Sequence, residues 1–267
     1  MAAAAYMDDG QHSVGIVMTA ACVHSLSFDR RAFLRELLAL AAILPCSVRA
    51  AGTRLPATVA GISFPQSAFA IAAAELCARV APGFLYNHCM RTYLFGALHA
   101  RHHGRVYRAE LAFVAAAFHD LGLLPVYESS EQPFEVDSAN VAERFALEHG
   151  ITETDAHLVW SAAAMHDVRW GIISHQNATI ELVAAGAAAD VIGPDPDMIS
   201  PELTREVVAA FPRMGFKKEF QGLLTGHCQR KPLSQVGTWL EGYCRSILPN
   251  TPASSTATAI NAAPFSE

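Results

Sequence analysis

The sequence predicts an all-α protein in which residues 52–250 form a single helical bundle. Its 267 residues are 52% hydrophobic, which is enough for one sizeable core and favours one domain over several. Alanine is frequent and runs of β-branched residues are scarce, so the composition favours helix. Apolar residues also recur at helical spacing, in segments that short loops separate.

The first two predicted helices are bounded by proline and glycine. Pro65 precedes the segment "QSAFAIAAAELCARVA", which ends near Pro82 and Gly83. Proline at the start of a helix and glycine past its end are typical of helix boundaries. The next segment, "FLYNHCMRTYLFGALHARHH", ends at Gly104. We therefore expect one helix on each side of Pro82.

The third segment, "RAELAFVAAAFHDLG", is apolar on nearly every face and ends at Gly122. A helix without a polar face is typical of the centre of a domain. A loop is predicted over residues 125–137, before the helical segment "SANVAERFALEHG", which Gly150 closes.

The later helices are predicted from caps and apolar spacing. Thr152 with Asp155 gives a start similar to a capping box for "ETDAHLVWSAAAMH". The remaining helices comprise "ATIELVAAGAAADVIG", two shorter ones after Pro201 and Pro212, and a last one over residues 234–247. Residues 251–267 lack an apolar period, and we expect this tail to be disordered.

The amino-terminal segment, residues 1–51, has the pattern of an export leader. The pair Arg30 and Arg31 precedes an apolar run over 37–44, and Ala50 and Ala51 follow it. This order is typical of a twin-arginine signal and predicts a periplasmic protein. The alternative is an amphipathic helix in a cytoplasmic protein. The run is shorter than the roughly 20 residues that span a bilayer, so we expect no stable membrane anchor in the mature chain.

Charge and cysteine content limit the partners. The net charge is −6 and no long basic run occurs, which excludes a nucleic-acid partner. Four cysteines lie beyond the leader, and no Cys-x-x-Cys pair exists. Disulfides and buried free thiols both stay open, with thiols slightly favoured, for Cys77, Cys89, Cys228 and Cys244. The composition permits either a monomer or a homodimer.

The end of the central apolar helix carries two adjacent polar residues, His119 and Asp120. An ionised carboxylate is very costly to bury unless it meets a cation or several donors. The helix before it offers His88, and a later apolar helix offers Asp190. Two imidazoles and two carboxylates suit zinc, iron, manganese or nickel. The sequence therefore predicts a metal site among four separate positions.

The pattern "NH…R", "FHDLG" and "DVIG" resembles the HD-domain superfamily. Within it, "FPQSAFAIAAAELCARVAPGFLYNHCMRTYLFG", "FEVDSANVAERFALEHG" and "PELTREVVAAFPR" are similar to cyanamide hydratase-like proteins, over about residues 55–247. The resemblance implies an all-α fold, one divalent transition metal and addition of water to a small nitrile. Zinc is expected first, with iron, manganese or nickel as alternatives. The implied ligands are His88, His119, Asp120 and Asp190.

The resemblance also implies a substrate pocket beside the metal. His166 is expected to line it and to donate or shuttle a proton, because imidazole titrates near neutrality. Asp167 departs from the family, which usually has a small hydroxyl residue there. We expect further substrate contacts from His175, Asn87 and Arg91. A second metal held by His166 and His175 is an alternative.

Four functions stay open, in descending order of expectation. The first is attack of metal-activated water on a small uncharged molecule such as cyanamide, which gives urea. The second is phosphohydrolysis. Leu123 and Leu124 stand where phosphodiesterase relatives often carry lysine, although Arg91 and Arg169 could contact phosphate. The third is a non-catalytic signalling or binding module, and the fourth an oxidative di-iron enzyme.

Three further histidines, His99, His102 and His103, lie near the end of the second helix. His99 is eleven residues beyond His88, roughly 16 Å along the helix. We expect these three side chains to form a solvated helix end and to hold no metal.

Overall fold

The structure is a computed structural model that describes residues 55–250 and residue 262. The chain divides into two units, residues 1–49 and 50–267, and only the second contains described residues. The predicted leader, residues 1–51, and the predicted disordered tail, apart from residue 262, lie outside them.

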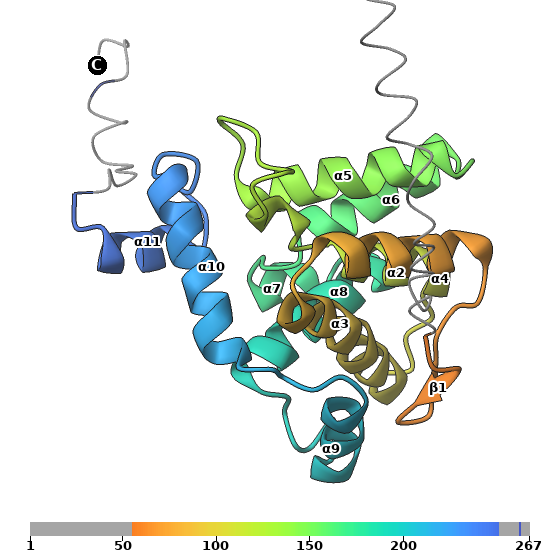
Figure 1. Cartoon of the computed structure of the whole chain (residues 1–267). Coiled ribbons are helices and arrows are strands. Elements are labelled where there is room, and N and C mark those ends of the chain that lie inside the picture. Colours follow the sequence, from red (N-terminus) through yellow and green to blue (C-terminus); the bar gives the residue numbers. More distant parts are fainter. Residues whose placement is uncertain (1–54, 251–261, 263–267) are drawn as a thin grey trace, which may run out of the picture. The chain divides into compact units, whose positions relative to one another are not determined.

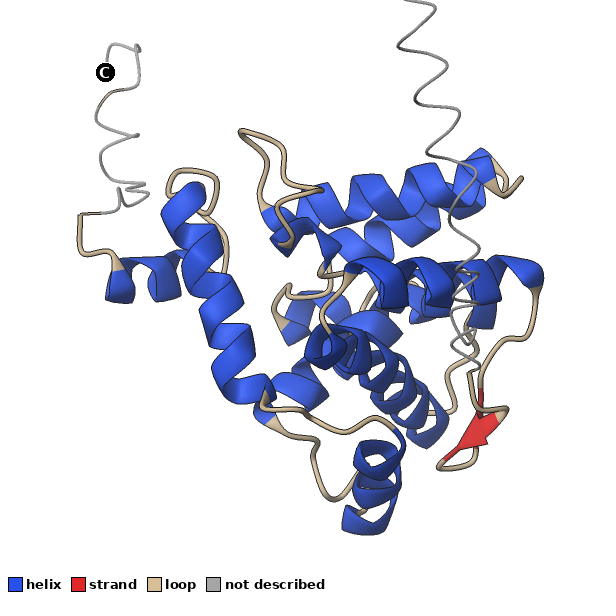
Figure 2. Cartoon of the chain, viewed as in Figure 1, coloured by secondary structure: helices blue, strands red, loops and turns tan. Residues whose placement is uncertain are grey.

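The prediction of an all-α fold is confirmed. Residues 55–250 form ten α-helices, one short 3-10 helix (η1) and one two-stranded antiparallel hairpin (Figures 1 and 2). The elements in chain order are β1 (Thr58–Val59), β2 (Ile62–Ser63), α2 (Ala68–Val80), α3 (Gly83–His102), α4 (Ala109–Phe118), η1 (Leu121–Leu123), α5 (Phe134–Glu148), α6 (Glu153–Ala164), α7 (Trp170–Ile173), α8 (Ala178–Ile192), α9 (Pro201–Ala210), α10 (Phe216–Arg230) and α11 (Glu241–Ile247). None of the described helices combines the length and the apolar character that crossing a bilayer requires.

Several helices begin where their caps predict. The Thr152 hydroxyl accepts a hydrogen bond from the backbone N–H of Asp155 at 3.3 Å, which confirms the predicted start of α6. The backbone of Gly104 and Gly150 has positive φ, so glycine suits the chain reversals that follow α3 and α5. These three boundaries thus follow from local sequence.

Four boundaries differ from the prediction. Helix α4 ends at Phe118, so the His119–Asp120 pair lies in the turn after it. Helix α5 begins at Phe134, which shortens the predicted loop, because acidic side chains in its first turn stabilise a helix start. The helix after Pro212 is long, residues 216–230, whereas the last helix covers only residues 241–247. The hairpin and α7 are too short for apolar periodicity to reveal.

Helix α4 is the centre of the bundle. All of its residues from Leu111 to Phe118 are buried, as its apolar sequence predicts. It packs against α2, α3, α5, α6 and α8. The polar pair at its end is therefore carried into the interior of the protein.

Helices α3 and α8 cross antiparallel at very short range. A Cβ atom on Gly186 would lie 1.9 Å from the carbonyl oxygen of Thr92, and one on Gly96 would lie 2.1 Å from that of Leu182. Only glycine permits this approach. Four residues further along each helix, in the same register, His88 meets Asp190. The glycine contacts therefore fix the distance between these two predicted ligands.

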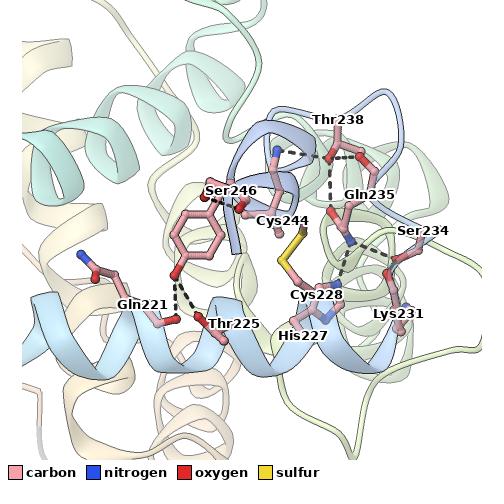
Figure 3. The surroundings of a disulfide bond; sticks show 12 residues. Gln221, Thr225, His227, Cys228, Lys231, Ser234, Gln235, Thr238, Cys244 and Ser246 are labelled. Atoms are coloured by element: carbon pink, nitrogen blue, oxygen red, sulfur yellow. Dashed lines mark hydrogen bonds between the residues drawn. A yellow bond between two sulfur atoms is a disulfide. The ribbon is translucent and has the colours of Figure 1, made fainter. Parts of the chain in front are cut away.

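The carboxyl-terminal helices are joined by a disulfide. Cys228 of α10 and Cys244 of α11 are bonded (Figure 3), with their Cα atoms 5.4 Å apart. Cys77 and Cys89 are buried free thiols. The open question about the cysteines thus has a mixed answer. Next to the disulfide, His227 Nδ1 lies 2.8 Å from Glu128 Oε1, which ties the loop before α5 to α10.

Candidate metal centre

Three buried side chains converge on one point between α3 and the end of α4. The Nε2 atoms of His88 and His119 are 3.2 Å apart, and they lie 3.2 and 3.3 Å from Asp120 Oδ2. Each residue is at most 1% exposed. Ligand atoms about 2.0–2.2 Å from one ion, at tetrahedral or octahedral angles, are about 3.0–3.5 Å apart. One cation could therefore contact all three atoms without rearrangement.

Hydrogen bonds at the far side of each imidazole orient the two rings. His119 Nδ1 lies 2.8 Å from the carbonyl oxygen of Ala116, and His88 Nδ1 lies 2.7 Å from Asp190 Oδ2. Both partners accept, so Nδ1 carries the proton in each ring. In the neutral rings the Nε2 lone pairs are then directed at the point between His88, His119 and Asp120, as in carboxylate–histidine–metal and carbonyl–histidine–metal arrangements.

The turn after α4 brings His119 and Asp120 to the same side. His119 keeps helical backbone angles, φ −56° and ψ −24°, whereas Asp120 leaves the helix with φ −113° and ψ 5°. Gly122 follows, and a Cβ atom there would lie 2.1 Å from the carbonyl oxygen of Phe134. Its N–H donates to Ser138 Oγ at 2.8 Å. The turn is thus packed directly against α5, which holds the pair in place.

The charges of His88, Asp120 and their neighbours favour a bound cation. Burial raises the pKa of Asp120, but His119, His88 and His166 outweigh that effect and hold it well below its usual range. Burial lowers the pKa of His88, yet its contacts with Asp120 and Asp190 raise it to about 9. Asp120 Oδ2 is buried, and the polar atoms described next to it are the Nε2 atoms of His88 and His119, at 3.2 and 3.3 Å. A buried, ionised carboxylate is best satisfied by a positive charge.

Asp190, the fourth predicted ligand, lies behind His88. Its carboxylate accepts hydrogen bonds from Arg91 Nε and Nη2, both at 2.7 Å, and from Arg213 Nη1 at 2.8 Å, in addition to its contact with His88. It is not part of the three-atom cluster that could hold an ion among the described residues. Direct coordination by Asp190 stays a prediction, whereas its contact orients His88. No role was predicted for Arg213 from the sequence.

His166 is placed beside the cluster, as expected. Its Nδ1 lies 2.7 Å from the carbonyl oxygen of Ala163, and its Nε2 faces Asp120 Oδ1 at 3.6 Å. The imidazole packs against that of His119, with 4.7 Å between the ring centroids. The Nε2 atom of His166 therefore faces the cluster of His88, His119 and Asp120, within reach of a group bound there.

The other predicted substrate residues are not gathered at this point. His175 is exposed on the turn after α7. Asn87 donates to the carbonyl oxygen of Pro212 at 2.8 Å, and Arg91 is fully buried, with donors to Asp190 and to the carbonyl oxygen of Phe211. Substrate contact by these three residues stays a prediction without a supporting contact. The candidate ligand cluster found among the described residues does not include His175, so the alternative second metal also stays a prediction.

The prediction for His99 was wrong. His102 and His103 are exposed, but His99 is only 7% exposed, and its Nε2 lies 3.5 Å from Glu181 Oε1. The close crossing of α3 and α8 buries this part of α3. The position of His99 near the end of its helix gave no indication of that contact.

Glu135 is a buried acid that the sequence analysis missed. It is 5% exposed, and neither carboxylate oxygen has a hydrogen-bond partner among the described residues. Burial first, and then the neighbouring Asp167, raise its pKa to about 9. Burial and the neighbouring carboxylate thus favour the protonated form of Glu135. The available signal was its place one residue into α5, directly after the buried Phe134.

A cleft of about 210 Å³ adjoins His166. Its polar lining comes from His166 and Asp167, and its apolar lining includes Trp170, Val191 and Trp239. His166 therefore contacts both the cleft and, through Asp120, the candidate metal cluster.

These features define a helical protein with a histidine–aspartate site suited to one metal ion. A comparison with known families agrees, because residues 85–187 match the HD domain. The chain thus carries an HD domain, and the matched segment includes His88, His119, Asp120 and His166 but stops before Asp190. No curated protein matches the chain.

Proposed function

We propose that the protein is a metal-dependent hydratase or hydrolase that adds water to a small uncharged substrate, for which cyanamide is the first test compound. The observation that carries the proposal is the triangle of His88 Nε2, His119 Nε2 and Asp120 Oδ2, with sides of 3.2–3.3 Å. Hydrolytic metal sites commonly combine imidazole and carboxylate ligands and leave a position open.

Each residue of the site has a proposed role. His88, His119 and Asp120 hold one divalent ion, zinc first, with iron, manganese or nickel as alternatives. Asp190 orients His88, and its direct coordination, predicted from the sequence, is the alternative role. A bound ion of this kind lowers the pKa of water and polarises a substrate atom.

His166 is proposed to move the proton that the reaction requires. Its Nδ1 is held at 2.7 Å by the carbonyl oxygen of Ala163, so Nε2 is the atom that can accept or deliver a proton. That atom lies beside Asp120, and His166 also lines the cleft. Among the described histidines, His166 alone lines this cleft, so it is the proposed proton carrier between the metal cluster and the substrate.

Phosphohydrolysis is the second candidate, because the HD domain supports hydrolases of this type as well. The lining of the 210 Å³ cleft, as described, includes no lysine or arginine. Phosphate sites usually rely on such side chains. Arg91 is occupied by Asp190, and Arg169 remains exposed next to α7. The electrostatics of the cleft therefore favour the uncharged substrate.

The test uses the zinc-loaded chain with cyanamide and, separately, bis(p-nitrophenyl) phosphate. We expect urea to form without turnover of the phosphate ester. Asp120→Asn should lose both the metal and activity, whereas His166→Ala should keep the metal and lose activity. His157→Ala, which alters an exposed side chain of α6, is the control and should change neither.

Other results would change the assignment. Turnover of the phosphate ester alone would replace the proposal by the second candidate. A chain that binds no transition metal at all would favour a non-catalytic module.

A further inference from the structure

The cleft beside His166 is larger than cyanamide needs. Its volume is about 210 Å³, and a water molecule takes about 30 Å³ in the liquid. Ligand sites usually measure about 300–1,000 Å³, so the cleft suits a ligand below drug size. A molecule of a few non-hydrogen atoms would leave most of this space to solvent. The dimensions point to a substrate with an additional group.

The walls of the cleft are apolar. Ala184, Ala187 and Val191 of α8 line it, together with Trp170 of α7 and Trp239, which precedes α11. The two indole side chains remain 48% and 46% exposed. A single exposed apolar residue is ordinary, but several gathered around one cavity indicate a place where an apolar ligand binds.

The charge of the cleft opposes anions. His166 and Asp167 are its polar lining residues, and no lysine or arginine belongs to the lining that the structure describes. The Asp167 carboxylate, with no lysine or arginine beside it in this lining, disfavours an anionic group at short range. An uncharged group meets no such penalty.

Trp239 is held in place by the carboxyl-terminal network. It lies within the segment that the Cys228–Cys244 disulfide closes. In this segment Thr238 Oγ1 donates to the carbonyl oxygen of Gln235 at 2.9 Å, and the Gln235 side chain lies 2.7 Å from His227 Nε2 (Figure 3). These contacts attach the turn that carries Trp239 to α10. The position of the Trp239 backbone beside the cleft is therefore restrained.

We infer that the natural substrate is an uncharged molecule with a small apolar group, aliphatic or aromatic, which packs against Trp170 and Trp239 while its polar end reaches His166. The inference rests on the proposed function. For a nitrile, addition of water across the carbon–nitrogen triple bond gives the corresponding amide, with no other product. Trp170, Trp239 and Val191 then determine which substrates fit.

The test measures binding of unreactive amides to the zinc-loaded full chain by calorimetry. We expect benzamide to bind at least tenfold more tightly than acetamide. Trp239→Ala should remove most of this difference. Trp160→Phe is the control, because Trp160 does not line the cleft. Its Nε1 donates a hydrogen bond to Asn140 Oδ1, and its ring stacks on His157.

The possible outcomes separate the two proposals. Equal affinities for benzamide and acetamide, or tighter binding of phenyl phosphate than of benzamide, would overturn the inference. If benzamide binds as expected while cyanamide and benzonitrile are not hydrated, the proposed reaction fails and the apolar binding site stands. If cyanamide is hydrated but benzamide binds no better than acetamide, the reaction stands and the substrate class fails.

Discussion

The apparent affinity for zinc should keep rising with pH well above neutrality. In the metal-free protein His88 lies between the carboxylates of Asp120 and Asp190, and its pKa is raised to about 9. An ordinary histidine titrates near 6.5. Zinc requires the unprotonated Nε2, so binding must displace one proton at any pH below about 9.

The magnitude follows from this single proton. One displaced proton makes the apparent affinity rise about tenfold, or about 1.4 kcal/mol, for each pH unit. Between about pH 7 and pH 9 the apparent affinity should rise about fiftyfold, whereas the affinity of a site of ordinary histidines would level off near pH 7. The protonation of His88 also affects the stability of the metal-free fold. A raised pKa stabilises the metal-free fold fully below about 6.5, and this contribution is lost as pH rises towards 9.

The assay is competition with a chromophoric chelator of known pH dependence, over about pH 6.5–8.5. Calorimetry in two buffers of different ionisation enthalpy should show about one proton released at pH 7.5. His157→Ala should keep the same slope, because its side chain is exposed. An affinity that is constant above pH 7, or binding without proton release, would refute the reasoning.

Three further predictions concern stability, each measured by urea unfolding of the metal-free protein. Glu135→Gln should be more stable than the parent at pH 8, by at least about 1 kcal/mol. The pKa of Glu135 is raised to about 9 in the fold, so the parent loses stability as pH rises above the unfolded-state pKa, whereas glutamine does not titrate. An equal difference at pH 5 would contradict this. Gly186→Ala should lower the free energy of unfolding by about 3 kcal/mol, because its Cβ atom would lie 1.9 Å from the carbonyl oxygen of Thr92. Gly222→Ala, with open space around it, should raise the free energy of unfolding by about 0.5–1 kcal/mol. Similar effects at both positions would contradict the close crossing of α3 and α8. Replacing Cys228 and Cys244 by serine should cost about 3 kcal/mol for this sequence separation of 16, and the variant should be insensitive to dithiothreitol; a parent that dithiothreitol does not destabilise would rule out the disulfide.

The parts of the molecule that depend on local pattern were predictable. The apolar run of α4 predicts a buried helix, and the histidine–aspartate pair at its end predicts a buried polar site. Caps such as Thr152 fix helix starts through hydrogen bonds within one turn. His88 was predictable as well, because "NH…R" lies in an otherwise buried helix.

The parts that depend on long-range contacts were not. Arg213 reaches Asp190 across 23 residues, from a loop whose path no periodicity describes. Trp239 joins the lining of a cleft made mostly by α7 and α8. The pairing of Gly96 and Gly186 with the facing helix is visible only once their register is known. Such contacts depend on how the helices cross, which the spacing of apolar residues leaves open.

The packing of Phe216 and Phe220 on His88 has a consequence for any attempt to isolate the matched HD segment. Their rings lie 4.8 and 5.5 Å from the imidazole, and both belong to α10, beyond residue 187. A fragment ending at residue 187 would also lack Asp190, which orients His88. Water would then reach a side chain that is 1% exposed in the whole chain, and its titration would return towards that of an ordinary histidine. The smallest piece expected to retain the metal site therefore extends through α10.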